Sequence, residues 1–550
     1  MTRWIFLSLL SLSLQAFAIV DMKNANYSET WTDIEVPGGG YTMKVARTYN
    51  SRALFNGMFG FGWCSDFETT LEVSPEGNLW VTECGAGSRT TYAPTLLTEA
   101  EIGKSADQII AKVKAEKVAG RTEAFYADLR KELILSDKAR NEYAKKYRVS
   151  TPPREGLKYL ANGKEVEHFV YAKPYYVRNF ADGSSQRFDK DGKITHFYDK
   201  NQNFLKYEYE KGLLASVTDN NSRRFTFKYF PNKKVREIIG PNGLKAEYKF
   251  EKLDDLSFVK NGWGNSFTYQ YDEGHNLTKA TWPDKSFISI KYDQKKDWVV
   301  GFTDRDKCIE AYSYEDSPTD PKKHYWSIAK KTCKGKVVAE NRYEFWHKKD
   351  PSGQYFLEKV LSEVSGEATE ITYHEVFGKP TSIRKNQNRT NYEYYPDGLV
   401  KVKATTAAKM VYTYEPQSKR ISKVAVDFLN EKSVKVASKW TAFKYDAKSN
   451  LNYAENSDGQ KINLTYDNKG RIATIVDQAK KVVKIDYEDR FGKPSLVTRP
   501  GLGTIKVSYT PKGEIQKVDS KEGPTVAIQV ASAFNNLLDV IAPATAEIYL

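Results

Sequence analysis

The sequence is poor in the residues that build metal sites and densely cross-linked scaffolds. Its 550 residues include 4 cysteines and 5 methionines, and it contains no C-x-x-C pair and no Cys/His cluster. A small disulfide framework and a zinc-binding fold are therefore excluded as organising principles. We predict no metal site and no cofactor.

Long hydrophobic runs are also missing after residue 18, although a transmembrane helix needs about 20 apolar residues. The first 18 residues instead have the order of a signal peptide, with Arg3, an apolar stretch from Trp4 to Leu14, and Ala16-Phe17-Ala18. We expect cleavage after Ala18 and export to the periplasm, the outer cell surface or the medium. No transmembrane segment is predicted.

The four cysteines fall into two local pairs, Cys64/Cys84 and Cys308/Cys333. Export would permit disulfides, and four cysteines allow three connectivities. Proximity in the chain favours Cys64–Cys84 and Cys308–Cys333.

Catalytic motifs are absent as well. The 6 histidines are scattered, and neither H-E-x-x-H nor G-x-S-x-G occurs. Two carboxylate pairs, Asp304/Asp306 and Asp254/Asp255, lie at expected turns, where aspartate is common for backbone reasons. We therefore predict no catalytic residue, and an enzyme acting on polysaccharide through an unrecognised acid pair stays an alternative.

The formal net charge is +14 and the mean hydropathy is −0.62. Lysine and arginine are scattered rather than clustered, which is typical of solvated strand faces. A basic surface could also attract anionic polysaccharide or lipid headgroups. Specific nucleic-acid binding is not predicted.

Aromatic residues are plentiful, with 36 tyrosines and 27 phenylalanines. Between Phe443 and Ser520 they follow a repeat of about 21 residues, marked by Tyr445, Tyr466, Tyr487 and Tyr509. Each block alternates polar and apolar residues up to the tyrosine, continues through a polar or glycine-containing turn, and ends in a second short apolar run. This pattern predicts a β-hairpin that is stable only against its neighbours.

Related tyrosines extend the array towards the N-terminus, so residues 151–520 are predicted to form one repeat domain. Most steps measure about 19 to 23 residues, and three steps near 30 suggest longer turns. We expect the repeat tyrosines to lie on the buried face of the sheet. The earlier members are Tyr209, Tyr229, Tyr248, Tyr271, Tyr292, Tyr314, Tyr343, Tyr373, Tyr394 and Tyr414.

The stretches Tyr271–Ala280, YDEGHNLTKA, and Tyr466–Ile472, YDNKGRI, resemble the YD repeats of the bacterial Rhs (rearrangement-hotspot) family. The resemblance covers about residues 40 to 520. It implies a mainly β fold in which hairpins form a long coiled sheet or hollow shell. The D-P-x-G self-cleavage motif of toxin-bearing members does not follow Tyr509, so autoproteolysis and an attached toxin are not expected.

Residues 19–95 are predicted to form an N-terminal β domain with strands at 31–36 and 41–49. They include a segment similar to the N-terminal Rhs signature, Y-N-S followed by G-x-F-G-x-G-W. Its glycines should allow tight turns and close strand approach, while its aromatic residues fill a core. The signature residues are Tyr49, Asn50, Ser51, Gly57, Phe59, Gly60, Gly62 and Trp63.

Two segments depart from the β pattern. Residues 96–150 have helical spacing of apolar residues between about 97 and 147, which predicts two or three helices that either cap an open sheet edge or bind a partner. Residues 521–550 contain an apolar stripe formed by Val526, Val530, Phe534, Leu537 and Ile541, which predicts an amphipathic C-terminal helix.

These features predict an exported, non-enzymatic scaffold or binding protein of the bacterial cell envelope, contacting carbohydrate or protein partners. A shell that encloses a separate toxin or effector is the second hypothesis. The oligomeric state does not follow from the sequence.

Overall fold

In the computed structural model, the described residues are 20–38, 42–74, 77–83, 89–94, 99–149, 155–161, 163–164, 166–251, 253–350, 353, 355–501, 503–510, 514–520 and 540. The predicted signal peptide and cleavage site lie outside them. The predicted C-terminal helix also lies outside them, except for Val540.

Residues 20–68 form a small N-terminal sheet with the order β1-β2-β3-β6, in which the two predicted strands are confirmed. Its alternating apolar residues make one face of β2 and β3 fully buried. The elements are β1 (Val20–Asp21), β2 (Asn26–Val36), β3 (Met43–Asn50), β4 (Asn56–Gly57), β5 (Gly60–Phe61), β6 (Trp63–Cys64) and the short 3₁₀ helix η1 (Asp66–Glu68).

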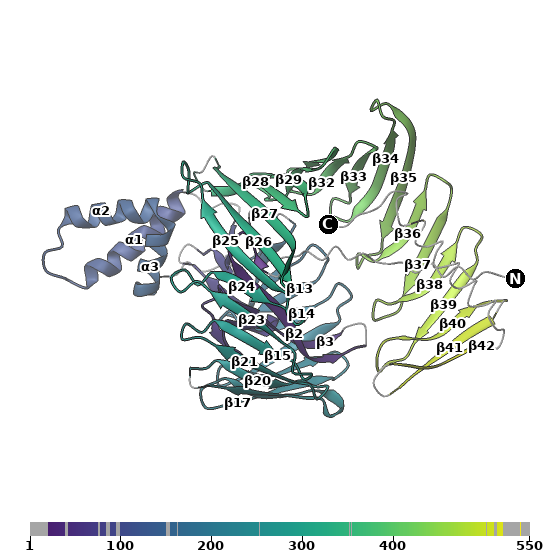
Figure 1. The fold of residues 1–550 in the computed structure, drawn as a ribbon, viewed down its shortest axis with the longest axis horizontal. Coiled ribbons are helices and arrows are strands. Elements are labelled where there is room, and N and C mark those ends of the chain that lie inside the picture. The colour runs from purple at the N-terminus through teal and green to yellow at the C-terminus, as the bar shows by residue number, and fades with distance from the viewer. Residues whose placement is uncertain are drawn as a thin grey trace.

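Strands β7 to β42 form one continuous antiparallel sheet in which almost every strand pairs with its neighbours in sequence, so the predicted mainly β hairpin array is confirmed. Figure 1 shows the sheet coiling around the N-terminal strands and then continuing into a curved strip. The strands are β7 (Thr70–Val73), β8 (Leu79–Thr82), β9 (Arg89–Pro94), β10 (Lys158–Leu160), β11 (His168–Ala172), β12 (Tyr175–Asn179), β13 (Ser185–Phe188), β14 (Ile194–Tyr198), β15 (Phe204–Glu210), β16 (Leu213–Asp219), β17 (Arg224–Tyr229), β18 (Val235–Ile239), β19 (Lys245–Phe250), β20 (Leu256–Lys260), β21 (Ser266–Tyr271), β22 (Leu277–Thr281), β23 (Phe287–Tyr292), β24 (Val299–Thr303), β25 (Ile309–Asp316), β26 (His324–Cys333), β27 (Lys336–Lys349), β28 (Tyr355–Val364), β29 (Glu367–Tyr373), β30 (Pro380–Lys385), β31 (Asn388–Tyr394), β32 (Val400–Ala404), β33 (Ala408–Tyr414), β34 (Ile421–Leu429), β35 (Lys435–Tyr445), β36 (Leu451–Asn456), β37 (Lys461–Tyr466), β38 (Ile472–Asp477), β39 (Val482–Tyr487), β40 (Pro494–Arg499), β41 (Gly503–Tyr509) and β42 (Ile515–Ser520). A further 3₁₀ turn, η2 (Pro241–Gly243), lies between β18 and β19.

The repeat tyrosine has the same structural role in many blocks, although Tyr248 is an exception because its hydroxyl donates to Asp33. It ends the first strand of its hairpin beside a β-bulge, and its hydroxyl donates a hydrogen bond to the carbonyl of the residue 15 positions earlier, which begins the second strand of the preceding hairpin. These bonds measure 2.6 to 3.1 Å and link Tyr229 to Leu214, Tyr271 to Leu256, Tyr292 to Leu277, Tyr314 to Val299, Tyr466 to Leu451, Tyr487 to Ile472 and Tyr509 to Pro494.

Apart from Tyr248, which is fully buried, the repeat tyrosines are half-buried, which refines the expectation that they lie on the buried face. Tyr466 packs against the apolar cluster on that face, while the fully buried position is two residues earlier, at Leu464. The bulge tilts the tyrosine towards the hairpin end, where its hydroxyl reaches the neighbouring carbonyl.

The prediction that the three long repeat steps contain longer turns is mostly wrong, because most of the extra residues lengthen strands. β27 has 14 residues and β35 has 11, whereas β37 and β39 have 6 each. An extended hairpin needs only a continued apolar–polar alternation, which these segments supply.

The helical insertion consists of α1 (Glu99–Ala115), α2 (Glu123–Leu135) and α3 (Asp137–Tyr147). It leaves and rejoins the sheet between the paired strands β9 and β10, and it projects away from the body in Figure 1. Its buried side chains, including Ile109 and Leu133, pack on one another and form a separate core. The helices therefore do not cap an edge of the sheet, which was one of the two predicted roles, and partner binding stays a prediction.

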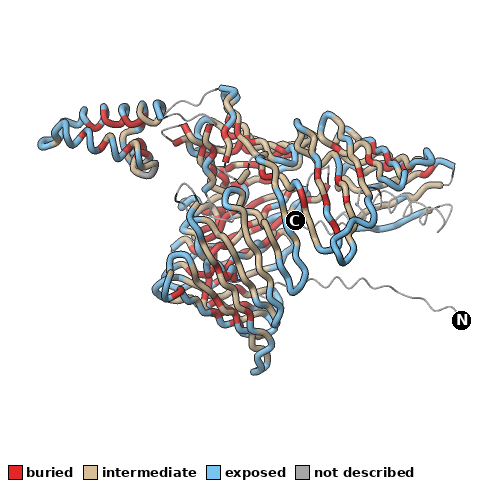
Figure 2. Tube along the Cα trace, turned by 90° about the horizontal axis from the view of Figure 1, so that it is seen from above, coloured by how far each residue is buried: buried red, intermediate tan, exposed pale blue. Residues whose placement is uncertain are grey.

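Buried apolar residues divide the protein into two lobes (Figure 2). In the first lobe, strands β7–β28 share one core with the N-terminal sheet. In the second lobe, strands β32–β42 carry two smaller clusters, one of which includes Val540. Strands β29–β31 connect the lobes.

Candidate functional site

The N-terminal signature lies on the inner face of the first lobe, against the repeat tyrosines. The backbone N–H of Leu277 donates to the Tyr49 hydroxyl at 2.8 Å, and the Trp63 indole N–H donates to the Tyr271 hydroxyl at 2.7 Å. Tyr49 and Trp63 are fully buried. Two groups of residues that the sequence suggested separately, the signature and the repeat tyrosines, are thus brought together.

A buried ion pair that the sequence analysis missed stands at the centre of this contact. Arg47 Nε and Asp33 Oδ2 are 2.8 Å apart, and both side chains are at most 1% exposed. Tyr248 donates to the same Asp33 oxygen at 2.9 Å, and Arg47 donates to the Tyr269 hydroxyl at 2.7 Å. The guanidinium also lies 4.4 Å from the Trp63 ring centre.

The alternation of apolar residues in strand β3 could have predicted this pair. Met43, Val45, Arg47 and Tyr49 all face inward, so Arg47 is a charge at a core position. A buried arginine requires an acidic partner, but only the fold shows that this partner is Asp33.

Burial raises the pKa values of the tyrosine hydroxyls at this contact. It raises the pKa values of Tyr49, Tyr248 and Tyr271, and it raises the pKa of Tyr269 to about 12. These hydroxyls stay protonated at neutral pH, so they act as hydrogen-bonding groups that hold the N-terminal sheet in place.

The glycine-rich half of the signature permits close approach. Gly60 has φ +93°, and a Cβ there would lie 2.3 Å from the Asp254 carbonyl oxygen. Phe59 is fully buried, and Phe61 stacks on His275 with ring centres 4.5 Å apart. A Cβ at Gly57 would collide with the carboxylate of Glu68.

The other signature residues shape the turn after β3. The Asn50 side chain accepts from the Arg52 N–H at 2.9 Å, and the Ser51 hydroxyl accepts from the Tyr27 N–H at 2.9 Å. Gly62 has φ +73° and lies against the Tyr49 ring. The signature therefore works as one packing unit.

A second charged cluster surrounds the buried Arg178. Its guanidinium donates to Glu167 at 2.6 Å and to Glu83 at 2.9 Å, and Tyr92 bonds to Glu167. Burial alone would raise the pKa of Glu83, but the bonds to Arg178 hold it below its usual value. Burial raises the pKa of Tyr92. Lys164 Nζ also lies 3.8 Å from each carboxylate, so two cations balance the two acids, which suits a structural cluster better than acid–base catalysis.

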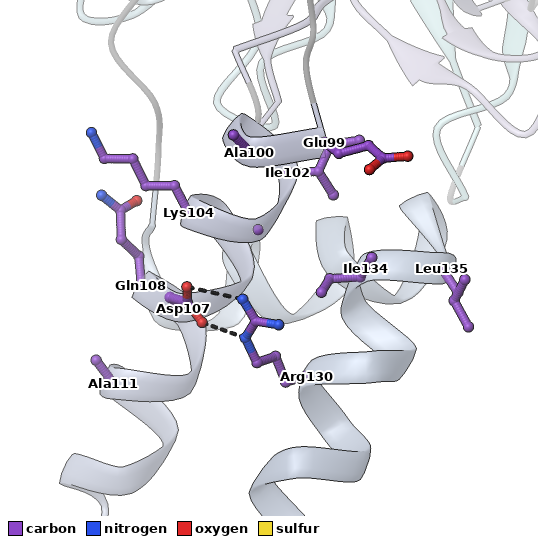
Figure 3. Close-up of a pocket in the computed structure, with 11 residues that line it drawn as sticks. Glu99, Ala100, Ile102, Lys104, Asp107, Gln108, Ala111, Arg130, Ile134 and Leu135 are labelled. Carbon is purple, nitrogen blue, oxygen red and sulfur yellow. Dashed lines mark hydrogen bonds and ion pairs between the residues drawn. The ribbon is translucent and has the colours of Figure 1, made fainter.

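The helical insertion contains an open groove of about 1020 Å³ between α1 and α2 (Figure 3). An exposed ion pair, Asp107–Arg130, crosses it with an Nε–Oδ1 distance of 2.6 Å. Ile102, Ile134 and Leu135 supply apolar lining, and Leu135 is 77% exposed.

Of the carboxylate pairs noted in the sequence, Asp304 stabilises its turn, whereas Asp254 and Asp255 bond to side chains of neighbouring hairpins. Asp304 Oδ1 accepts from the Cys308 N–H at 2.8 Å, and Asp255 bonds to the His275 ring at 3.0 Å. Among the described residues, no three His, Cys, Asp or Glu side chains gather into a group that could hold a metal ion. No helix in the described part of the chain is long and apolar enough to cross a membrane.

The Cys308–Cys333 disulfide is present, with its Cα atoms 4.4 Å apart on β26 and the turn before β25. Cys64 takes part in a disulfide, while its predicted partner Cys84 lies outside the described residues.

Comparisons with known proteins give a family match and distant relatives. Residues 18–92 match a protein family described as a domain of unknown function, DUF6531. The chain is 23% identical over 296 residues to the tRNA3(Ser)-specific nuclease WapA of Bacillus spizizenii, which covers 48% of this chain and 13% of that protein. The tRNA nuclease WapA of Bacillus subtilis matches with the same identity and coverage. The chain thus spans 13% of the length of these curated relatives.

Among solved structures, the chain is similar to TcdB2-TccC3-TEV, with 12% identity and a TM-score of 0.42 over 66% of this chain and 22% of that chain. It is also similar to the Photorhabdus luminescens Tc holotoxin pore, with 11% identity and a TM-score of 0.38 over 90% of this chain and 28% of that chain. The family match, the sequence relatives and the hairpin array together support the resemblance to Rhs and other YD-repeat proteins.

Proposed function

We propose that this protein is an exported, non-enzymatic YD-repeat scaffold that holds a polypeptide partner on the inner face of its second lobe. One observation carries the proposal: the two lobes have similar hairpins, but the described residues fill their inner faces to different degrees. In the first lobe, the N-terminal sheet covers the inner face and shares its core.

In the second lobe, the same face carries buried clusters ringed by half-buried apolar side chains. Tyr414, Ile421 and Phe428 surround one cluster, and Ile472 and Tyr487 surround the other. Val540, a residue distant in sequence, is buried in the second cluster and already occupies part of this face. A sheet face of this kind gains stability when a second polypeptide covers it.

The test is to isolate the exported protein from native envelope and medium fractions and to digest the complex with protease. A co-purifying polypeptide that resists digestion only while bound supports the proposal. The size of that polypeptide separates a bound segment from an enclosed toxin or effector. Recovery of the protein alone at every step contradicts both versions.

Export is a separate part of this proposal. N-terminal sequencing of the exported protein should give Ile19 as the first residue, because the residues before it have the order of a signal peptide. Exported protein that begins at Met1 contradicts the cleavage.

A carbohydrate ligand is the second candidate, and the outer face of β26–β28 favours it. Trp326 and Trp346 lie half-buried on this face, with Glu344 beside them. Arg342 and Lys359 lie over the two indole rings. The two cations held over the rings suit an acidic sugar chain, which they would bind through charge. A glycan array probed with the parent and with Trp346→Ala tests this candidate, and equal signals from both contradict it.

A further inference from the structure

A polar contact joins the two lobes at a place where no strand pairing crosses between them in the described part of the chain. Turns of the first lobe, at residues 180–184 and 199–203, meet turns of the second lobe, at residues 415–420, 446–450 and 467–471. We call this contact the seam. In Figure 1 these turns lie between β13–β14 and β36–β38.

The bonds of the seam are made by side chains of the turns. Asn450 Nδ2 donates to Asn201 Oδ1 at 2.9 Å, and Asn203 Nδ2 donates to the Lys469 carbonyl at 3.0 Å. Lys200 Nζ donates to the carbonyl of Ser449 at 3.3 Å. Farther along the seam, Arg420 donates to the carbonyl of Asp182.

The aspartates at the start of these turns fix the positions of the seam side chains. Asp199 accepts the N–H groups of Asn201 and Asn203 at 2.8 Å each, and Asp446 accepts that of Asn450 at 2.8 Å. The aspartate that follows a repeat tyrosine thus fixes the turn, and the turn holds its asparagine against the other lobe.

Among the described residues, no buried apolar cluster spans the seam, although Gly38 of the first lobe lies against the backbone of Phe491 in the second lobe. The first-lobe cluster includes no residue beyond Val360, and both second-lobe clusters begin at or after Val400. Each seam bond stabilises the closed arrangement by only about 0.5–1.5 kcal/mol, because hydrogen bonds to water replace it when the seam separates. Separation therefore exposes polar groups and little apolar surface.

The connection between the lobes is thin. Among the described residues, no hydrophobic side chain between Phe345 and Val402 is fully buried. Strands β29, β30 and β31 in particular contain only half-buried and exposed residues. The turn between β29 and β30 lies against Gly163, but no buried core anchors these strands. A sheet layer without such a core bends and twists more easily than a sheet anchored on one.

We infer that the second lobe moves relative to the first lobe by bending of strands β29–β31. The seam bonds oppose this movement, and we call them the latch. Closed, the Asn450–Asn201 and Asn203–Lys469 bonds hold the lobes together. Open, the turns separate and the inner face of the second lobe becomes accessible from the side. The inference stands on the seam and the connecting strands, and it does not depend on the proposed partner.

Distance measurements between two pairs of spin labels test the inference. Gln202→Cys with Lys448→Cys spans the seam from exposed turn positions. Gln202→Cys with Ser222→Cys lies within the first lobe and serves as the internal reference. Both pairs are measured in the parent protein and in the latch variant Asn203→Ala/Asn450→Ala.

We expect the latch variant to raise the open-to-closed ratio across the seam about tenfold, since two bonds are lost. The reference distance should not change. Asn276→Ala is the matched control, because Asn276 donates to the turn acid Asp272 at 3.2 Å in a hairpin outside the seam. It should leave both distances as in the parent.

Three results would overturn the inference. The first is a cross-seam distance that is the same in the parent and in the latch variant, with both proteins folded by thermal melting. The second is a change in both label pairs together, which means unfolding of the first lobe. The third is an equal effect of Asn276→Ala on the cross-seam distance.

Discussion

The hydroxyl of Tyr466 donates a 2.6 Å hydrogen bond to the carbonyl of Leu451, the residue that begins the second strand of the preceding hairpin. The same bond recurs in six further hairpins, so each of these hairpins is tied to the one before it by a side chain as well as by strand pairing. Repeat proteins depend on such contacts between neighbours, since one hairpin has no core of its own.

Tyr466→Phe should lower the free energy of unfolding by about 1–2 kcal/mol, because it leaves the Leu451 carbonyl without its tyrosine donor. Tyr466→Ala should cost about 2–3 kcal/mol, less than the roughly 3–5 kcal/mol of a fully buried aromatic residue, since Tyr466 is half-buried. Urea unfolding of each variant gives both values. Tyr355→Phe, at a tyrosine that is 47% exposed, is the control and should have no effect.

The aspartate after the repeat tyrosine should matter equally in every block. Asp467 Oδ1 accepts the N–H groups of Lys469 and Arg471 at 2.9 Å, and its counterparts at 272, 293 and 446 also bond to turn N–H groups. Replacing each of the four by Asn should cost under about 1 kcal/mol, because the amide keeps one acceptor oxygen.

Asp306→Asn, at an exposed turn position, is the control for this series. Melting temperatures and any measured activity should be compared for all five variants. A single site whose replacement removes an activity at unchanged stability would refute the scaffold interpretation.

Removing one member of the buried Arg47–Asp33 pair should lower the free energy of unfolding far more than replacing both members by apolar residues. Asp33→Ala should destabilise the protein by about 3–5 kcal/mol, since it leaves an uncompensated guanidinium in the core. Arg47→Met/Asp33→Leu should recover much of that loss. Lys439→Met, which removes the exposed pair with Asp458, should cost under 1 kcal/mol. Asp33→Ala with the stability of the parent would contradict the assigned role.

Alkaline pH should lower the free energy of unfolding of the repeat array. Burial raises the pKa of Tyr466 to about 12, and it does the same for Tyr414 and Tyr394. The folded state therefore holds these protons more tightly than the unfolded chain, whose tyrosines titrate near pH 10. The resulting stability is complete below about pH 10 and is lost as the pH rises towards 12.

Absorbance of tyrosinate and the urea midpoint, both followed from pH 9 to 12, check this expectation. Tyr466→Phe should make the urea midpoint less dependent on pH, because one titrating tyrosine is removed. A urea midpoint that does not fall across this range would contradict it.

The Cys308–Cys333 disulfide should stabilise the long hairpin region. It closes a loop with a sequence separation of 25 residues, for which the chain-entropy model gives about 3 kcal/mol. Cys308→Ser/Cys333→Ser should lower the free energy of unfolding by about 2–4 kcal/mol. Peptide mapping without reduction should recover 308 joined to 333 and 64 joined to 84, and free thiols or crossed pairs would refute the pairing.

The sequence by itself determined the local architecture. The period of about 21 residues, the alternation before each tyrosine and the turn acids after it describe one hairpin, because strand alternation and turn chemistry act over a few residues. The helical spacing between 99 and 147 identified the insertion for the same reason. The disulfide between residues 308 and 333 followed from their short separation.

Only the tertiary structure decided how these units are used. The coiling of the sheet placed Asp33 beside Arg47 and Tyr248, residues more than 200 positions apart at the extremes, and no local pattern encodes that distance. It turned the helices away from the sheet edge, although their composition fitted a cap equally well. It also brought Asn203 to Lys469, because the twist accumulated over many strands, and not any single hairpin, decides which turns meet at the seam.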